Sequence, residues 1–254
     1  MPRRNSFGTL EICCGCGVFS DGCETVGFGR VDRHDILISK SMDLCSKSYV
    51  AGVKAGISAG IYDYVHFGTE CTTWSHAAKP CYRHPSLKWI LGHPIALRSK
   101  STRLNMLAVH LMVAHTIEIM RHCWAKNVFT SLENPATSMM WQYPGERGGW
   151  SMAQLMACTG FVSFNTHYCA WGAPWRKATN ILTNCGVLQA ALERPCCGKR
   201  VHKTTLSGGV KVRVNGKTKW IARTKLANRY PSKLVKCWTE TLACAVAARR
   251  QRRL

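Results

Sequence analysis

The chain has 254 residues, 46% of them hydrophobic, and it carries 35 Lys and Arg against 13 Asp and Glu, a formal net charge of +22. This length and apolar content suffice to bury a full α/β core. No signal peptide precedes the first predicted strand, which argues against a secreted, disulfide-bonded protein despite the 15 cysteines. We therefore expect a reducing intracellular location, the nucleus in a eukaryote and otherwise the cytoplasm.

The start of the chain predicts a strand, a glycine turn and a helix. Residues 9–14 form a short apolar strand that runs into the turn at Gly15 and Gly17. This order is typical of a nucleotide-binding βαβ unit, in which glycine lets the backbone approach the ligand closely. Asp32 follows 21 positions after Glu11, the usual distance for a ribose-binding carboxylate at the end of the second strand. Together these residues predict a nucleoside site.

Two later strands each end in a residue that can do chemistry. Residues 62–68 lead to Cys71, and residues 127–132 lead to Glu133. Both are short runs of β-branched and aromatic residues stopped by turn residues, which indicates buried parallel strands. Functional groups gather beyond the carboxyl ends of such strands. A thiol and a carboxyl group delivered there can act as nucleophile and acid on one substrate.

Between these strands, the sequence predicts a loop and a helix. Residues 74–103 are polar, contain proline and are rich in histidine, which indicates a flexible loop over Cys71. The apolar stretch 104–120 predicts a core helix and not a membrane span, because it carries charged and histidine side chains. Helical spacing assigns its buried face to Leu104, Leu107 and Leu111.

One cysteine cluster in the C-terminal third can bind a metal. It consists of Cys185, Cys196, Cys197 and His202. The residue types suit zinc, although the spacing is not that of a standard zinc motif. The alternative is buried cysteines in a turn-rich segment.

The positive charge is concentrated near the C-terminus. Residues 190–254 hold 17 Lys and Arg against 2 Asp and Glu, and residues 208–221 predict a hairpin around Asn215-Gly216. One hairpin face would carry Val210, Val212 and Val214. Basic candidates for phosphate contacts are Lys211, Arg213, Lys217 and Lys219. We expect DNA or RNA as the partner, with an acidic partner, an anionic membrane surface or mere solubility as alternatives.

A last helix carries an apolar stripe of Leu234, Trp238, Leu242 and Val246.

These segments, in this order, resemble the DNA cytosine-5 methyltransferases and their shorter, divergent relatives. Residues 10–17 resemble the S-adenosylmethionine loop, residues 68–75 the nucleophile loop, and residues 132–135 the Glu-Asn-Pro motif. Residues 168–179 are similar to the segment with the substrate-side arginine, and Tyr230-Pro231 to the closing motif.

The resemblance implies a Rossmann-like α/β methyltransferase sheet with a small basic C-terminal subdomain. It implies a catalytic domain over residues 1–184, a target-recognition-like region over 185–228, and a helix over 229–254 that packs back on the catalytic domain. Cys71 would be the nucleophile, Glu133 the proton donor to ring nitrogen 3, and Arg176 the group that holds the base. The implied cofactor is S-adenosylmethionine, bound by Glu11, Gly15, Gly17, Asp32 and Asp43, with Asp43 at the adenine.

The sequence also departs from the family pattern. Glu70 stands where the nucleophile loop usually has proline, and a neighbouring carboxylate disfavours the Cys71 thiolate. The arginine segment is reduced to Arg176-Lys177. Two alternatives to an active cytosine-5 methyltransferase therefore remain: a nucleic-acid-binding protein on the same scaffold with weakened or lost catalysis, and a zinc-stabilised basic binding module.

Overall fold

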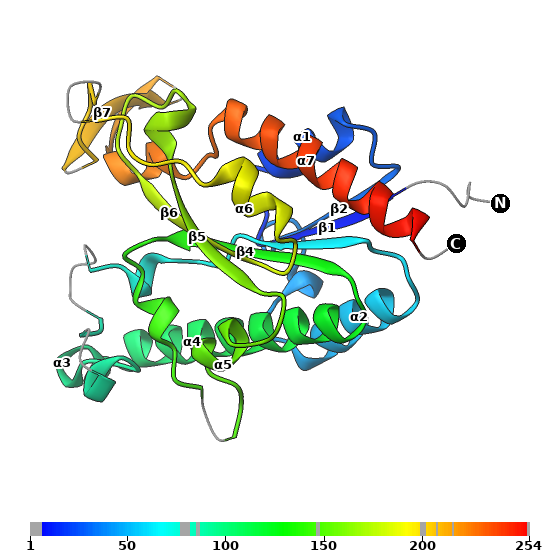
Figure 1. Ribbon diagram of the computed structural model, residues 1–254. Coiled ribbons are helices and arrows are strands. Elements are labelled where there is room, and N and C mark those ends of the chain that lie inside the picture. The colour runs from blue at the N-terminus through cyan, green and yellow to red at the C-terminus, as the bar shows by residue number, and fades with distance from the viewer. Residues whose placement is uncertain are drawn as a thin grey trace.

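A computed structural model of the protein describes residues 7–76, 82–84, 87–145, 148–198, 202–206, 208–214 and 216–252. Within these residues, a six-stranded sheet has the spatial order β2-β1-β3-β4-β6-β5 (Figure 1). The parallel pairs join β2 to β1, β1 to β3 and β3 to β4, whereas β6 runs antiparallel between β4 and β5. The strands are β1 (Gly8–Ile12), β2 (Arg30–His34), β3 (Tyr64–Phe67), β4 (Phe129–Pro135), β5 (Val162–His167) and β6 (Ala178–Thr183).

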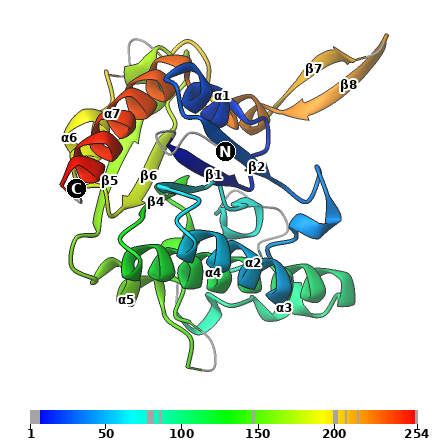
Figure 2. The same ribbon diagram turned by 90° about the vertical axis from the view of Figure 1, so that its right-hand side faces the viewer.

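Helices cover both faces of this sheet, so the expected α/β class is confirmed and the fold is compatible with a Rossmann-like arrangement. One face carries α1 (Val18–Thr25), α6 (Val187–Leu192) and α7 (Ser232–Gln251). The other carries α2 (Lys47–Ser58), α4 (Lys100–Ala125) and α5 (Met152–Met156), with α3 (Pro94–Leu97) beside α4 (Figure 2). Short 3-10 helices are η1 (Lys40–Met42), η2 (Thr72–Trp74), η3 (Leu87–Trp89), η4 (Met139–Gln142), η5 (Tyr168–Trp171) and η7 (Arg223–Ala227). None of the helices in the described ranges combines the length and apolarity that a membrane span requires.

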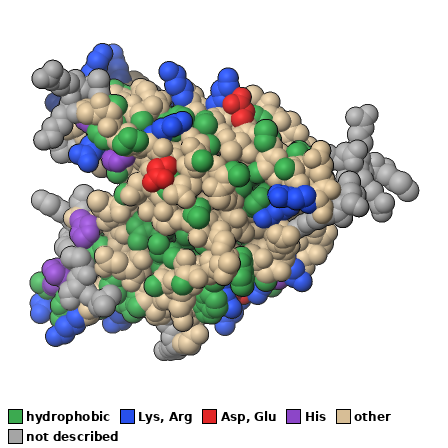
Figure 3. All heavy atoms as spheres, viewed as in Figure 1, with side chains coloured by type: hydrophobic (Ala, Val, Ile, Leu, Met, Phe, Trp, Pro, Cys, Tyr) green, Lys and Arg blue, Asp and Glu red, His purple; other side chains and the backbone are tan. Residues whose placement is uncertain are grey.

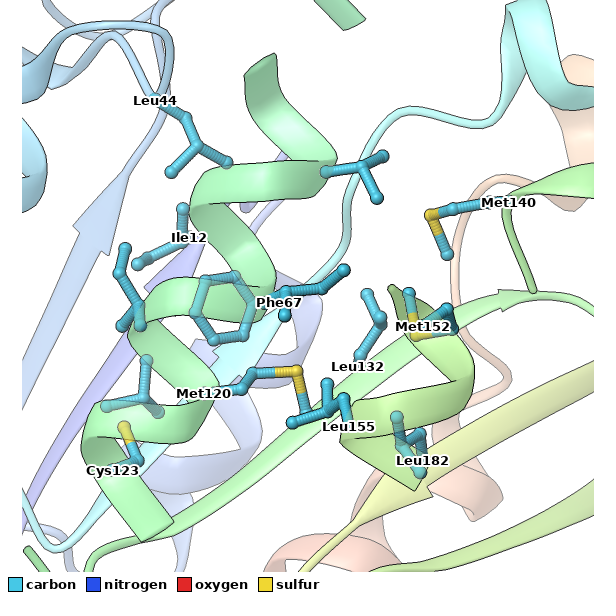
Figure 4. Close-up of a cluster of buried hydrophobic side chains, with 14 of the residues drawn as sticks. Ile12, Leu44, Phe67, Met120, Cys123, Leu132, Met140, Met152, Leu155 and Leu182 are labelled. Carbon is cyan, nitrogen blue, oxygen red and sulfur yellow. The ribbon is translucent and has the colours of Figure 1, made fainter. Parts of the chain in front are cut away.

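The first hydrophobic core lies between the sheet and α4. Ile12, Phe67 and Leu132 project from the three central strands toward Met120 and Cys123 of α4 (Figure 4). All five side chains are at most 1% exposed. Helices on both faces explain why the burial of β1, β3 and β4 is continuous and does not alternate along the strands, even at their polar residues.

The predicted helix exists, but its predicted buried face is wrong. Leu104, Leu107 and Leu111 are 56%, 49% and 43% exposed. The helix is apolar on more than one face, so helical spacing alone does not select the face that meets the sheet. The buried stripe consists of Met106, Val109, Val113, Ile117 and Met120.

The second core joins the other face of the sheet to α1, α6 and α7. The stripe expected on the last helix is buried there, with Trp238 completely inaccessible and Leu234, Leu242 and Val246 at most 1% exposed. Leu188 and Leu192 of α6 belong to the same cluster. The start of the expected 185–228 region therefore packs in this second core through α6.

The loop expected over residues 74–103 is largely packed where the structure describes it. Trp74 and Arg83 are fully buried, and the Arg83 guanidinium lies 3.4 Å from the centre of the Trp74 ring. Arg83 also donates to the backbone oxygens of Thr73 and Ile90, each at 2.9 Å. The prediction of a flexible loop is therefore wrong for these positions, while residues 77–81 and 85–86 lie outside the described residues.

The predicted hairpin forms a second, two-stranded sheet of β7 (Gly209–Val214) and β8 (Lys217–Ala222). Figure 2 shows it projecting away from the six-stranded sheet. Gly216 has a left-handed φ of 75°, as the expected turn requires, and Asn215 lies outside the described residues. Lys211 and Arg213 are exposed on this projecting hairpin.

Candidate active site

The structure brings Cys71 and Glu133 to neighbouring positions at the carboxyl edge of the sheet. Phe67 of β3 pairs with Leu132 of β4. Glu133 is the residue after Leu132, and Cys71 is the fourth residue after Phe67, so both follow the same pair. The side chain of Asn134 ties the two loops together, because its Nδ2 donates to the Thr69 backbone oxygen at 2.7 Å. The predicted nucleophile and acid thus lie on adjacent, mutually fixed segments.

The surroundings of Cys71 act on its thiol in opposite directions. Burial raises the pKa of the Cys71 thiol above its ordinary value, and the positive charge of Lys177 lowers it. The charges of Glu133 and Glu70 raise the pKa further. Glu70 therefore acts in the expected direction, but burial has the larger effect. The thiol can lose its proton readily only when its burial, or the negative charge of Glu133 and Glu70, is offset.

Three donors surround the carboxyl group of Glu133, which is 7% exposed. Thr179 donates its hydroxyl to Oε1, Tyr230 donates to Oε2 at 3.2 Å, and the Lys177 Nζ lies 3.6 Å from Oε1. Thr179 is in β6, opposite Pro135 of β4, and Tyr230 directly precedes Pro231 and α7. Segments distant in the sequence therefore fix the orientation of this acid.

The positive group beside Glu133 is Lys177, not its neighbour Arg176. The Lys177 side chain is 16% exposed, and it also donates to the Tyr168 hydroxyl at 3.1 Å and to the Ala227 backbone oxygen at 3.2 Å. Arg176 is exposed, and its charge acts on His167. Successive residues entering β6 point in opposite directions, so only one of these two side chains can face Glu133. The structure thus places Lys177 beside Glu133 and Cys71, while the role expected of Arg176 stays a prediction.

A buried chain of hydrogen bonds supports Glu133 from the core. Burial lowers the pKa of His66 to about 3, so its imidazole is neutral and one ring nitrogen donates while the other accepts. Its Nε2 lies 3.1 Å from the Tyr230 hydroxyl and its Nδ1 lies 2.7 Å from Ser131 Oγ. One set of directions satisfies every member of the chain, running from the Trp238 indole through Tyr64, Ser131, His66 and Tyr230 to Glu133.

The predicted glycine turn follows β1. Gly15 and Gly17 have left-handed φ values of 53° and 67°, which favour glycine, and α1 begins at Val18. Glu11 faces α1 and accepts from the backbone N–H of Ser20 at 3.0 Å and from its hydroxyl at 2.5 Å. Burial raises the pKa of Glu11 to about 7. Glu11 therefore ties the helix to the strand behind the turn.

The second predicted cofactor acid is displaced by three residues. Asp32 lies inside β2, where it accepts from Arg30 at 2.8 Å and from the Tyr62 hydroxyl at 2.6 Å. Strand β2 ends at His34, so Asp35 occupies the position at the strand end that the prediction gave to Asp32. Asp35 Oδ2 accepts from the Gly15 N–H at 3.0 Å. Asp43 follows η1 and accepts from the Cys45 N–H at 2.8 Å.

The residues around the glycine turn fit a nucleoside such as that of S-adenosylmethionine. The left-handed glycines leave the backbone open, and a Cβ added at Gly15 would meet no atom within 4 Å. Asp35 keeps lone pairs for hydroxyl groups after its bond to Gly15. The chain order reverses between β1 and β3, and ligands bind at such switch points of open α/β sheets.

A notch separates two lobes of the molecule at one side. Figure 3 shows a notch at its left edge, between the lobe that carries the hairpin and the lobe that carries α3, with Lys and Arg side chains on both. On the hairpin, Lys211 and Arg213 are exposed on one face together with Trp220, which is 67% exposed and pairs with Lys211. The register puts Lys219 on the face of Val212. The strand position of Lys217 is described, but its side chain lies outside the description.

The structure differs from the predicted metal cluster in one residue, with Cys169 in place of Cys185. Cys185 is completely buried in the second core with Trp238 and Leu188. Cys169, Cys197 and His202 instead offer ligand atoms that lie within 4.8 Å of one another, and Cys196 lies beside them. The sequence signal for Cys169 was weak, because 27 residues separate it from Cys196.

Comparison of the chain with protein-family models and with curated proteins finds no match.

Proposed function

We propose that the protein is an S-adenosylmethionine-dependent methyltransferase that acts on carbon 5 of cytosine in DNA, and less favourably in RNA. The observation that carries this proposal is the placement of Cys71 and Glu133 on adjacent loops held together by Asn134. Few reactions use a thiol and a carboxyl group on one planar substrate, and the resemblance of both loops to the cytosine-5 methyltransferases points to this one.

In the proposed reaction, the Cys71 thiol loses its proton to solvent, and its Sγ adds to carbon 6 of the ring, which forms a C–S bond and opens the carbon 5–carbon 6 double bond. The displaced ring electrons are stabilised by a proton that Glu133 supplies to nitrogen 3. The Lys177 ammonium takes the position expected for an arginine and holds the exocyclic oxygen of the base. S-adenosylmethionine, when bound, supplies the methyl group. Loss of the carbon 5 proton then returns electrons to the ring and breaks the C–S bond.

The electrostatics support a thiol that is activated by the substrate. The Glu133 charge raises the Cys71 pKa and the Lys177 charge lowers it. When Glu133 takes up a proton from solvent, which it needs in order to protonate nitrogen 3, its charge no longer opposes the Cys71 thiolate, and the Lys177 charge is opposed by Glu70 alone. We infer that Cys71 becomes nucleophilic after the base enters, which protects the thiol in the free protein.

The hairpin and the net charge support a nucleic-acid substrate. Lys211 and Arg213 can contact phosphates, and Trp220 beside them can stack on an unpaired base. The target base must leave the helical stack to reach a thiol at the edge of the sheet. The small hairpin favours weak sequence selectivity.

A second function, binding of nucleic acid with little or no catalysis, is favoured by one observation. Burial and two carboxylates raise the pKa of Cys71, whereas a single lysine lowers it. If Glu133 stays ionised when the base is bound, the thiol stays protonated and the scaffold only binds.

Trapping separates these two functions. The purified protein is incubated with S-adenosylmethionine and oligonucleotides that contain 5-fluorocytosine, in which fluorine replaces the proton that must leave. We expect a covalent adduct by mass spectrometry, mapped to Cys71 and abolished by Cys71→Ser. Glu133→Gln should slow adduct formation by about 100-fold or more, since its proton acts as charge develops. Binding of cofactor and DNA with no adduct on any sequence would favour the non-catalytic function, and an adduct on another cysteine would refute the site.

A further inference from the structure

A cluster of three cysteines and one histidine lies outside the proposed active site. Cys169 belongs to η5, in the loop that joins β5 to β6, and Cys196, Cys197 and His202 follow α6. The two segments are held side by side by the backbone, because the His167 N–H donates to the Arg194 oxygen at 3.1 Å. A second backbone bond, from the Thr204 N–H to the Pro174 oxygen at 3.1 Å, closes the far end.

The separations of Cys196 from Cys169 and from His202 match those between ligands of one metal ion. Cys196 Sγ lies 3.8 Å from Cys169 Sγ and 3.3 Å from His202 Nε2. Tetrahedral zinc, with its usual bond lengths, separates two sulfur ligands by about 3.8 Å and a sulfur from a nitrogen by about 3.5 Å. Cys197 completes the set, since its Sγ lies within 4.8 Å of ligand atoms of both Cys169 and His202.

We propose that Cys169, Cys196, Cys197 and His202 bind one zinc ion. Three thiolates and an imidazole are a closed structural ligand set, with no position left for a substrate. The ligands lose their protons when the metal binds, so the ion replaces weak thiol contacts with strong bonds. This proposal does not depend on methyltransferase activity.

The ion would hold the loop that delivers Lys177. Tyr168 directly precedes Cys169, and its hydroxyl accepts from the Lys177 Nζ at 3.1 Å. The backbone of Tyr168 also donates to the Lys177 oxygen at 2.9 Å. Zinc would thus join the segment after α6 to the β5–β6 loop. It would thereby fix the position of the Lys177 side chain beside Glu133. The ion is structural, and its effect on the active site passes through Tyr168 and Lys177.

Metal analysis of the full-length protein, purified under reducing conditions without chelators, tests the proposal. We expect about one zinc ion per chain by elemental mass spectrometry, the stoichiometry of a closed four-ligand site. Cobalt substitution should give the visible absorption of tetrahedral thiolate coordination. A chain without zinc that takes up neither metal overturns the proposal, as does a Cys169–Cys196 disulfide found after alkylation.

Variants identify the ligands. Cys169→Ser, Cys196→Ser and His202→Ala should each lower zinc retention against a chelator by about 10-fold or more, because a four-ligand site loses one of its bonds. His202→Cys should retain zinc, which shows that the loss in His202→Ala comes from the ligand. Cys244→Ser, at an exposed cysteine of α7, is the matched control. Circular dichroism checks that each variant folds. Unchanged retention in the folded Cys169 and Cys196 variants, or loss in Cys185→Ala alone, assigns the metal elsewhere and refutes this ligand set.

Discussion

The Lys177 ammonium lies 3.6 Å from Glu133 Oε1, with the two side chains 16% and 9% exposed. Lys177 comes from the loop before β6 and Glu133 from β4, so the sheet itself sets this separation. The same lysine lowers the pKa of Cys71. One cation therefore acts on both proposed reacting groups.

Lys177→Met should slow adduct formation with 5-fluorocytosine DNA by about 10- to 100-fold, the effect of losing a hydrogen bond to a charged group. The pKa of the Cys71 thiol should rise in the same variant, measured from the pH dependence of its alkylation rate. Arg176→Met is the matched control and should leave both quantities nearly unchanged. The reverse ranking of the two variants would restore Arg176 as the substrate-side cation.

The cofactor acid can be located by calorimetry with S-adenosylmethionine. Asp35→Ala should weaken binding by about tenfold or more, because a charged acceptor is lost from the glycine turn. Asp32→Ala should bind nearly as well as the unaltered protein, since Asp32 is engaged by Arg30 and Tyr62. If the unaltered protein gives no heat of binding, both the enzyme and a cofactor-retaining scaffold are excluded.

Glu11 predicts a pH dependence of stability. Its pKa rises from 4.5 to about 7 on folding because the carboxyl group is buried. Between these values the folded protein keeps a proton that the unfolded chain has lost, so stability falls as the pH rises from 4.5 to 7. This contribution amounts to about 3 kcal/mol. Urea unfolding at pH 5 and pH 7 should show that Glu11→Gln removes most of it.

His66 acts in the opposite direction, because its lowered pKa makes stability fall as the pH decreases toward 3. The comparison must therefore be the difference between Glu11→Gln and the unaltered protein, in which the His66 contribution cancels. Glu240→Gln, at an exposed position of α7, controls for the change in net charge. Equal pH dependence in all three proteins would mean that Glu11 does not retain a proton on folding.

The hairpin predicts two separable contributions to DNA binding. Lys211→Gln and Arg213→Gln should each reduce the slope of log affinity against log salt by about 1, whereas Trp220→Ala should leave the slope unchanged. Trp220→Ala should weaken binding to single-stranded DNA by about 1–3 kcal/mol through lost stacking. Lys126→Gln is the control, because this exposed lysine precedes β4 at the opposite edge of the sheet. If this slope is the same in all the hairpin variants, the hairpin charges do not contact phosphates and serve solubility instead.

Local patterns were sufficient to predict the strands that carry Cys71 and Glu133 and the glycine turn. Each is a short apolar run with its own stop signal, so the information lies within a few residues. The hairpin was predictable for the same reason. These segments fix the class of the sheet and its functional edge.

The errors arise where tertiary structure makes the choice. The end of β2 depends on its pairing with β1, which separates Asp35 from Asp32. The choice of Lys177 over Arg176 depends on the direction in which the chain enters β6. Cys169 joins the thiol cluster only because the sheet brings its loop beside the segment after α6. No local pattern contains these distances.

The reversed direction of β6 has a consequence for how such a site can change. Because β6 starts where β4 ends, Pro135 and Thr179 are paired although they lie 44 positions apart in the sequence. The chain leaves the site at Pro135, forms η4, α5, β5 and the following loop, and returns to it at Lys177. Both ends of this excursion are clamped by sheet hydrogen bonds. Gly148 and Gly149 are exposed in the middle of the excursion, whereas Tyr143, Met152 and Leu155 hold it in the core. A change of length at the two glycines can therefore leave Glu133 with its partners.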